Sequence, residues 1–186
     1  SRYVTVYEIS APEDNISSAS KDLRKVLDLC ARAAPGNHVF LPLDDNALWL
    51  CSEMLFPDDW VVAGASGSCA HLALDKWKQI ELARASGFRV PESLLSRSGE
   101  SLRERSIRYP IIIRPSRAVV VVEGKVCRGG NWICSGEAAV QGVMSMWEEK
   151  GPLLVQAYMH GTGEGVFGIA TENGVIAWSS HRRVRM

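Results

Sequence analysis

The stretch that decides the fold is residues 152–186, "PLLVQAYMHGTGEGVFGIATENGVIAWSSHRRVRM". Residues 153–157 and 166–170 are rich in apolar and β-branched side chains, which predicts two strands. Asn173-Gly174, followed by "VIAWSSH", is a strong signal for a two-residue hairpin turn. The segment therefore predicts antiparallel strands, with a polar hinge rich in glycine between the first two.

The first third of the chain has a different pattern. Residues 3–9 alternate as a short strand, and residues 17–34 place apolar side chains on one helical face. "HVFLP" predicts a buried strand, Asp44 or Asp45 can cap the next helix, and "WVVAG" adds a strand. The resulting β-α-β-α-β order predicts a small parallel sheet.

After the small-residue joint "GASGSC", the pattern changes to helices mixed with antiparallel strands. "LDKWKQIELARASG" predicts a helix, and "RYPIIIRP" and "RAVVVVEGKVCRGGNWIC" predict strands that turn at Glu123-Gly124. The predicted fold is thus α/β in residues 1–67 and α+β in residues 68–186, as two domains.

Composition narrows the classes of partner. The 21 basic and 21 acidic residues cancel, so no overall field attracts nucleic acid or anionic lipid, and we expect neither as a partner. The five cysteines are odd in number and too widely spaced for a disulfide framework or a zinc site, which favours a reducing cytoplasm. No apolar run approaches the roughly 18 residues of a membrane span.

Two cations could hold an anion locally. Arg114 follows the apolar run "YPIII" and precedes the rigid Pro115, so its backbone position is fixed. Its guanidinium can then bind a phosphate through two hydrogen bonds. Lys76 lies in "LDKWKQ" and would act as a point charge. On spacing alone, a solvated or salt-bridged structural role is the commoner explanation for both.

The hinge "QAYM" suits a flat heterocycle such as adenine. Gln156 could receive the exocyclic amine, Ala157 and Tyr158 could offer backbone groups, and Met159 could pack on the ring. An ordinary edge strand would have the same pattern, and the spacing of the residues does not distinguish an adenine site from such a strand.

Five motifs in a fixed order resemble the ATP-grasp superfamily, in the branch similar to the large subunit of carbamoyl phosphate synthetase. They are the DK helix, "GFRVP", "YPIIIRP", "VQAYMHG" and "HRR", and the resemblance covers about residues 38–186. It implies a pre-ATP-grasp-like domain followed by a partial ATP-grasp domain.

The resemblance also implies roles for individual residues. Lys76 matches a lysine that reaches the nucleotide phosphates, and Arg114 stands where the family usually has a second such lysine. Gln156 would accept the adenine amine, next to the hinge of Ala157, Tyr158 and Met159. Glu164 would lie near the ribose, and His181, Arg182 and Arg183 would border the phosphate or acceptor side. No residue of the chain is assigned a catalytic or metal-binding role.

The implied activity is that of a ligase that uses ATP to phosphorylate a small-molecule carboxylate before an amine or similar nucleophile attacks. Magnesium would serve in the parent protein, with ligands on strands beyond the "HRR" region, because Glu172 is the single acidic residue after Glu164. We expect a fragment that does not turn over alone and could pair as a homodimer through an open sheet edge.

Three departures from the family pattern favour a different class, a non-catalytic nucleotide-binding or protein-interaction module on the same scaffold. These departures are Arg114 in place of lysine, the missing carboxylates, and "SRAVVVVEG" where members have a glycine-rich loop. Gly129-Gly130 could supply such a loop or could form a turn. The sequence leaves open whether the chain is part of an enzyme.

Overall fold

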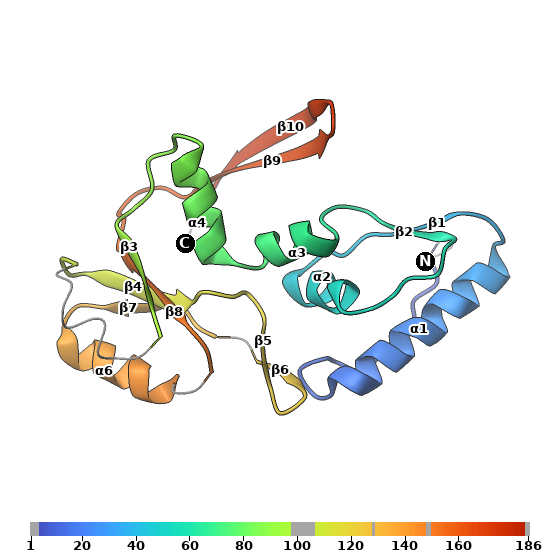
Figure 1. Cartoon of the computed structure of the whole chain (residues 1–186), viewed down its shortest axis with the longest axis horizontal. Helices are drawn as coiled ribbons and strands as arrows, with labels where there is room; N and C mark the ends of the chain where they lie inside the picture. Colours follow the sequence, from blue (N-terminus) through green and yellow to red (C-terminus); the bar gives the residue numbers. More distant parts are fainter. Residues whose placement is uncertain (1–3, 98–106, 128, 148–149, 185–186) are drawn as a thin grey trace.

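The computed structural model describes residues 4–97, 107–127, 129–147 and 150–184. Figure 1 shows three regions: the N-terminal helices with a small sheet at one end, a larger sheet at the other end, and a long hairpin that projects away from both. The mixed α/β and α+β class predicted from the sequence is confirmed, with a parallel two-stranded sheet and antiparallel sheets.

The N-terminal region contains two helices and two strands: α1 (Ile16–Ala33), β1 (His38–Phe40), α2 (Asp45–Ser52) and β2 (Trp60–Val62). β1 and β2 pair in parallel. Asp44 caps α2 by accepting a hydrogen bond from the Ala47 N–H, as one of the two predicted alternatives. A core forms between the helices and the sheet from Ala19, Leu23, Leu27 and Leu50, with aromatic rings packed against them.

The strand predicted over residues 3–9 is wrong for the part that the structure describes, since residues 4–9 have no strand pairing. Val6 is 80% exposed. The adjoining Ser10 donates hydrogen bonds from its N–H and its hydroxyl to Asp22 on α1, so this end of the segment is held by a helix rather than by a sheet. The described parallel sheet therefore has two strands instead of three.

The second half of the joint predicted at "GASGSC" is the start of a helix in the structure. α3 (Gly67–Ala73) begins within it and buries Ala70, and a tight junction leads directly into α4 (Lys76–Ala85). The predicted domain boundary thus falls at the first residue of α3. Asp75 caps α4 by accepting from the N–H groups of Trp77 and Lys78.

The larger sheet has the strand order β3-β8-β4-β7, antiparallel throughout. Its strands are β3 (Ser93–Ser96), β4 (Ile111–Pro115), β7 (Trp132–Cys134) and β8 (Leu153–Ala157). Helix α6 (Glu137–Met146) covers one face, where Val140, Val143 and the adjoining Trp147 pack on the apolar side chains of the sheet. Arg114 and Gln156 alternate with those buried positions, so they belong to the other face.

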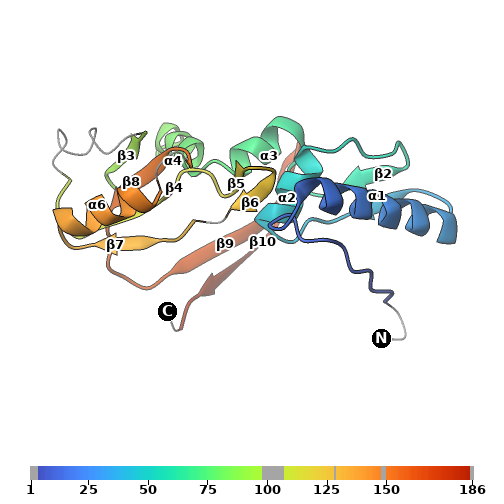
Figure 2. The same cartoon turned by 90° about the horizontal axis from the view of Figure 1, so that it is seen from below.

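Two hairpins complete the fold. β5 (Val120–Val122) and β6 (Lys125–Cys127) join through the predicted turn, with Glu123 and Gly124 both at positive φ. β9 (Glu164–Thr171) and β10 (Gly174–Arg182) form the second predicted hairpin, and among the described strands they pair with each other alone. Figure 2 shows β9 and β10 running below β7 and β8 toward the lower edge of the view. Within the described ranges, no helix is long and apolar enough to cross a membrane.

Candidate nucleotide-phosphate site

Lys76 and Arg114 are brought together by backbone hydrogen bonds between the start of α4 and the residues after β4. The Lys76 N–H donates to the Ser116 carbonyl at 2.8 Å, and the Ala118 N–H donates to the Leu74 carbonyl at 2.8 Å. An isolated bridge between Asp75 and Arg117 lies between these two bonds. The first residue of the helix therefore lies against the end of the strand that carries Arg114.

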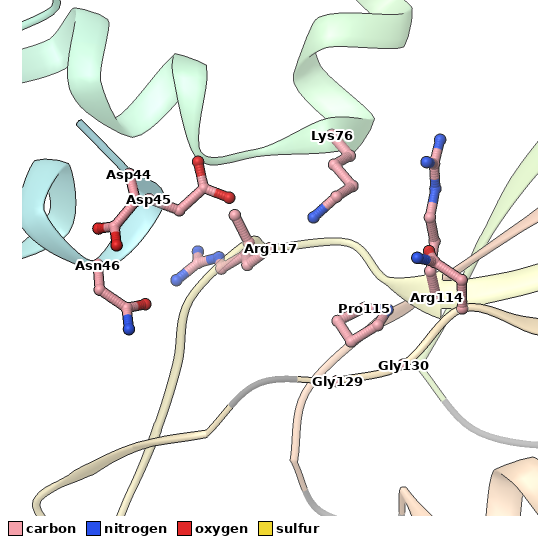
Figure 3. Close-up of a pocket in the computed structure, with 11 residues that line it drawn as sticks. Asp44, Asp45, Asn46, Lys76, Arg114, Pro115, Arg117, Gly129 and Gly130 are labelled. Carbon is pink, nitrogen blue, oxygen red and sulfur yellow. The ribbon is translucent and has the colours of Figure 1, made fainter. Parts of the chain in front are cut away.

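A cavity of about 290 Å³ opens at this junction. Figure 3 shows the Lys76 ammonium directed into it, with Asp45 and Arg117 on the other side and Pro115 below. The lining consists of Asp44, Asp45, Asn46, Lys76, Arg114, Pro115, Arg117, Ala118, Gly129, Gly130 and Asn131. Three of these side chains are cationic and two are carboxylates, so the lining carries a net positive charge, which favours a compact anion.

Burial and like charge act together on the cations. The pKa of Lys76 is lowered, first by burial and then by the positive charge of Arg114, while Asp45 and Asp75 act in the opposite direction. Burial also lowers the pKa of Arg114, which nevertheless remains protonated at any ordinary pH. A bound anion would offset the cost of burying the two positive charges and would reduce the repulsion between them.

Arg114 is held in place by a chain of buried polar contacts. Its terminal nitrogen donates to the Gln156 side-chain carbonyl, and the Gln156 amide donates to the Ser93 hydroxyl at 2.9 Å. Gln156 is 4% exposed. The Nε atom of Arg114 is buried and has no hydrogen-bond partner among the described residues, so one donor of the fork stays unsatisfied.

The hinge after β8 is only partly free. The Ala157 N–H donates to the Glu92 carbonyl at 2.9 Å and the Tyr158 N–H donates to the Pro110 carbonyl at 3.0 Å, so neither is available to a ligand. Within the described ranges, the Met159 N–H has no partner, and its side chain is 70% exposed. The donor that could face a ligand therefore lies one residue later than the predicted pair.

The other predicted residues lie on the hairpin and do not line the cavity. Glu164 accepts a hydrogen bond from Arg182 at 2.8 Å. His181 stacks on Phe167 and lies over Gly165, where a Cβ atom would come within 2.4 Å of the imidazole. The Arg183 N–H donates to the Gly163 carbonyl. These contacts join the four predicted residues to the hairpin itself.

Sequence reasoning missed several residues that line the cavity, notably Asp45 and Arg117. It left open the role of Gly129-Gly130, which line the same cavity from the segment before β7. A Cβ atom on Gly129 would lie 2.0 Å from Cγ of Pro115, so only glycine allows this close approach. In the sequence, the second arginine of "RPSR", which is Arg117, was the one signal for a further cation at the cavity.

A magnesium site is not evident from the side chains of the described residues. In those parts of the chain, no group of three or more His, Cys, Asp or Glu side chains could hold a metal ion.

Comparison with solved structures identifies the fold. N5-carboxyaminoimidazole ribonucleotide synthetase in complex with ADP matches with a TM-score of 0.58 and 15% identity, over 91% of this chain and 43% of that one. N5-carboxyaminoimidazole synthetase from Staphylococcus aureus matches with a TM-score of 0.57 and 13% identity, over 89% and 39%. L-amino acid ligase from Bacillus licheniformis matches with a TM-score of 0.53 and 12% identity, over 87% and 35%.

The chain thus spans less than half the length of each of these three proteins. No family model matches its sequence, and no curated protein sequence does either. The structural neighbours are ATP-grasp ligases. The fold of this chain is therefore similar to part of the ATP-grasp fold.

Proposed function

We propose that this chain is the ATP-binding portion of an ATP-grasp carboxylate ligase. The observation that carries the proposal is the cavity that Lys76 from α4 and Arg114 from β4 both line within this fold. The phosphates of ATP would lie between these cations, with the Arg114 guanidinium as a donor to a phosphate oxygen. The adenine would lie along residues 156–159.

The proposed reaction has two steps. A carboxylate oxygen of the substrate takes the γ-phosphoryl group of ATP, which gives an acyl phosphate and ADP. An amine then forms a bond to the acyl carbon and loses a proton, and inorganic phosphate leaves with the electrons of the broken C–O bond. Lys76 and Arg114 would bind and orient the phosphates, and their charge would stabilise the negative charge on the transferred group.

Two finer assignments belong to the same proposal. The order of the motifs supports the branch that resembles carbamoyl phosphate synthetase. Magnesium would accompany ATP in the whole protein and neutralise phosphate oxygens there. The carboxylate and the nucleophile would be small molecules, and cytoplasmic location follows from the reducing environment that the cysteines favour.

One observation favours the second candidate, a non-catalytic module on the same scaffold. Arg114 already has an internal partner in Gln156, and the Ala157 and Tyr158 N–H groups are bound within the sheet. If Arg114 serves only to hydrogen-bond the buried Gln156, its role is structural and no bound nucleotide is required to explain it. A protein-interaction module of this kind would not bind nucleotide, whereas the ATP-binding portion of a ligase would.

Calorimetric titration with ADP separates them. We expect saturable binding that Arg114→Ala and Lys76→Met each weaken by about 10- to 100-fold, the worth of a charge-assisted hydrogen bond. Lys78→Met is the matched control, because it removes the same charge from the same helix at a position outside the cavity. Absence of binding, or equal weakening by all three substitutions, would favour the non-catalytic module.

A further inference from the structure

A second cavity, of about 410 Å³, lies behind Arg117 where the N-terminal helices meet the segment after β4. Its walls come from α2, α3, the start of α4 and that segment. The lining consists of Trp49, Glu53, Ser68, His71, Leu74, Asp75, Lys78, Arg117 and Val119. Small-molecule sites occur preferentially at such junctions between two parts of a fold.

The floor of this cavity is apolar. Leu74 and Val119 are 5% and 6% exposed, and both belong to a buried cluster against which the half-buried Trp49 packs. An indole ring beside two aliphatic side chains suits the apolar body of a small ligand, because its burial removes nonpolar surface from water.

The rim carries charges of both signs that do not pair with each other. Glu53, Lys78 and Arg117 have no hydrogen-bond or ion-pair partner for their side chains within the described parts of the chain, although all three line one cavity. Asp75 differs, because its carboxylate caps α4. The separated charges leave room for a ligand that carries one charge of each sign.

We propose that this second cavity binds a small zwitterion, an amino acid with an apolar side chain. Its carboxylate would pair with Lys78 and Arg117, its ammonium group with Glu53, and its side chain would contact Trp49, Leu74 and Val119. Arg117 also lines the first cavity, so the bound carboxylate would lie beside the proposed phosphate site. The zwitterion site does not depend on nucleotide binding.

The test is an NMR titration without nucleotide, read at the indole N–H of Trp49, which the Trp49→Phe variant assigns. The probes are L-leucine, 4-methylpentanoate, which lacks the ammonium group, and 3-methylbutylamine, which lacks the carboxylate. We expect leucine to shift the Trp49 signal saturably and to bind about tenfold more tightly than either analogue. No shift with leucine, or equal binding of all three probes, would overturn the proposal.

Substitutions at the rim provide a second readout. Glu53→Gln and Lys78→Gln should each weaken leucine binding about tenfold, whereas Glu81→Gln, on the exposed side of α4, should not. Variants that keep the wild-type dispersion of NMR signals and still bind leucine normally would contradict the site. Because Glu53 and Lys78 lie outside the first cavity, both variants should keep ADP affinity, so failure here and failure of the ATP proposal are distinguishable.

Discussion

Arg114 is held from within the protein and still keeps one buried donor unsatisfied. Its contact with Gln156 fixes the guanidinium on the face of the sheet opposite α6, and its Nε atom has no partner among the described residues. Such a group is preorganised, because the rotamer is already fixed before a ligand binds. The same chain of contacts makes Gln156 important for stability.

Gln156→Leu should lower the free energy of unfolding by about 1–3 kcal/mol, because it leaves the buried Arg114 guanidinium without its acceptor and removes the amide that donates to Ser93, which keeps its bond to the Pro91 carbonyl. Gln156→Glu keeps an acceptor for Arg114 and should retain more of the stability. Urea denaturation of the three proteins gives both values. A neutral Gln156→Leu variant would mean that water already satisfies these groups.

Asp22 provides a residue-scale test at low pH. Hydrogen bonds from the Ser10 hydroxyl, from Lys25 and from the Ser10 N–H lower the pKa of Asp22 from 3.8 to about 2. Since the folded pKa lies below the unfolded one, the stabilisation is present above pH 3.8 and is lost as the pH falls toward 2. Ser10→Ala should raise the pKa toward 3.8, measured by NMR titration of the carboxyl carbon. An unchanged pKa would show that the hydroxyl contact does not form in solution.

At the scale of elements, the segment before β7 approaches β4 so closely that a side chain has no room. A Cβ atom on Gly129 would lie 2.0 Å from Cγ of Pro115 and 2.9 Å from the Trp147 ring. This approach places the backbone of Gly129 and Gly130 at the cavity. The glycines therefore shape the cavity as well as the sheet edge.

Gly129→Ala should destabilise the fold by about 1–3 kcal/mol, since Pro115 and Trp147 must shift to admit the methyl group. Gly142→Ala is the control: it lies in α6 with no atom near the added Cβ, and should stabilise by about 0.5–1 kcal/mol. Thermal denaturation of both variants measures the difference. Equal effects would contradict the close packing at Gly129.

Elements with a local cause could be predicted from the sequence. The cap at Asp44, one of two predicted alternatives, and the turn at Glu123-Gly124 depend on neighbouring residues, and both form. The second predicted hairpin also forms, but Gly174 already pairs with Thr171, so its two-residue loop is Glu172-Asn173, one residue earlier than predicted. The strand over residues 3–9 failed because alternation does not specify a partner. The cavity depends on contacts between segments distant in sequence, so spacing could indicate Lys76 and Arg114 but not Asp45 or Arg117.

At the scale of the whole molecule, the fold leaves both faces of the β9–β10 hairpin exposed. Val166 and Trp178 are 74% and 73% exposed, and the hairpin pairs with no other described strand. A two-stranded hairpin is marginally stable by itself, and a large exposed apolar surface favours association.

We expect the chain to self-associate through this hairpin as its concentration rises. Sedimentation velocity over a concentration series should show dimer, and Trp178→Lys should shift the population toward monomer by placing a charge on the apolar surface. Monomer at every concentration for the wild-type chain would rule this association out.

The most direct measurement is a crystal structure of the chain with ADP. The predicted result is density for the phosphates between the Lys76 ammonium and the Arg114 guanidinium, with the adenine beside residues 156–159. Phosphates bound elsewhere, or crystals grown in saturating ADP that show an intact Arg114–Gln156 contact and no nucleotide, would contradict the proposed site.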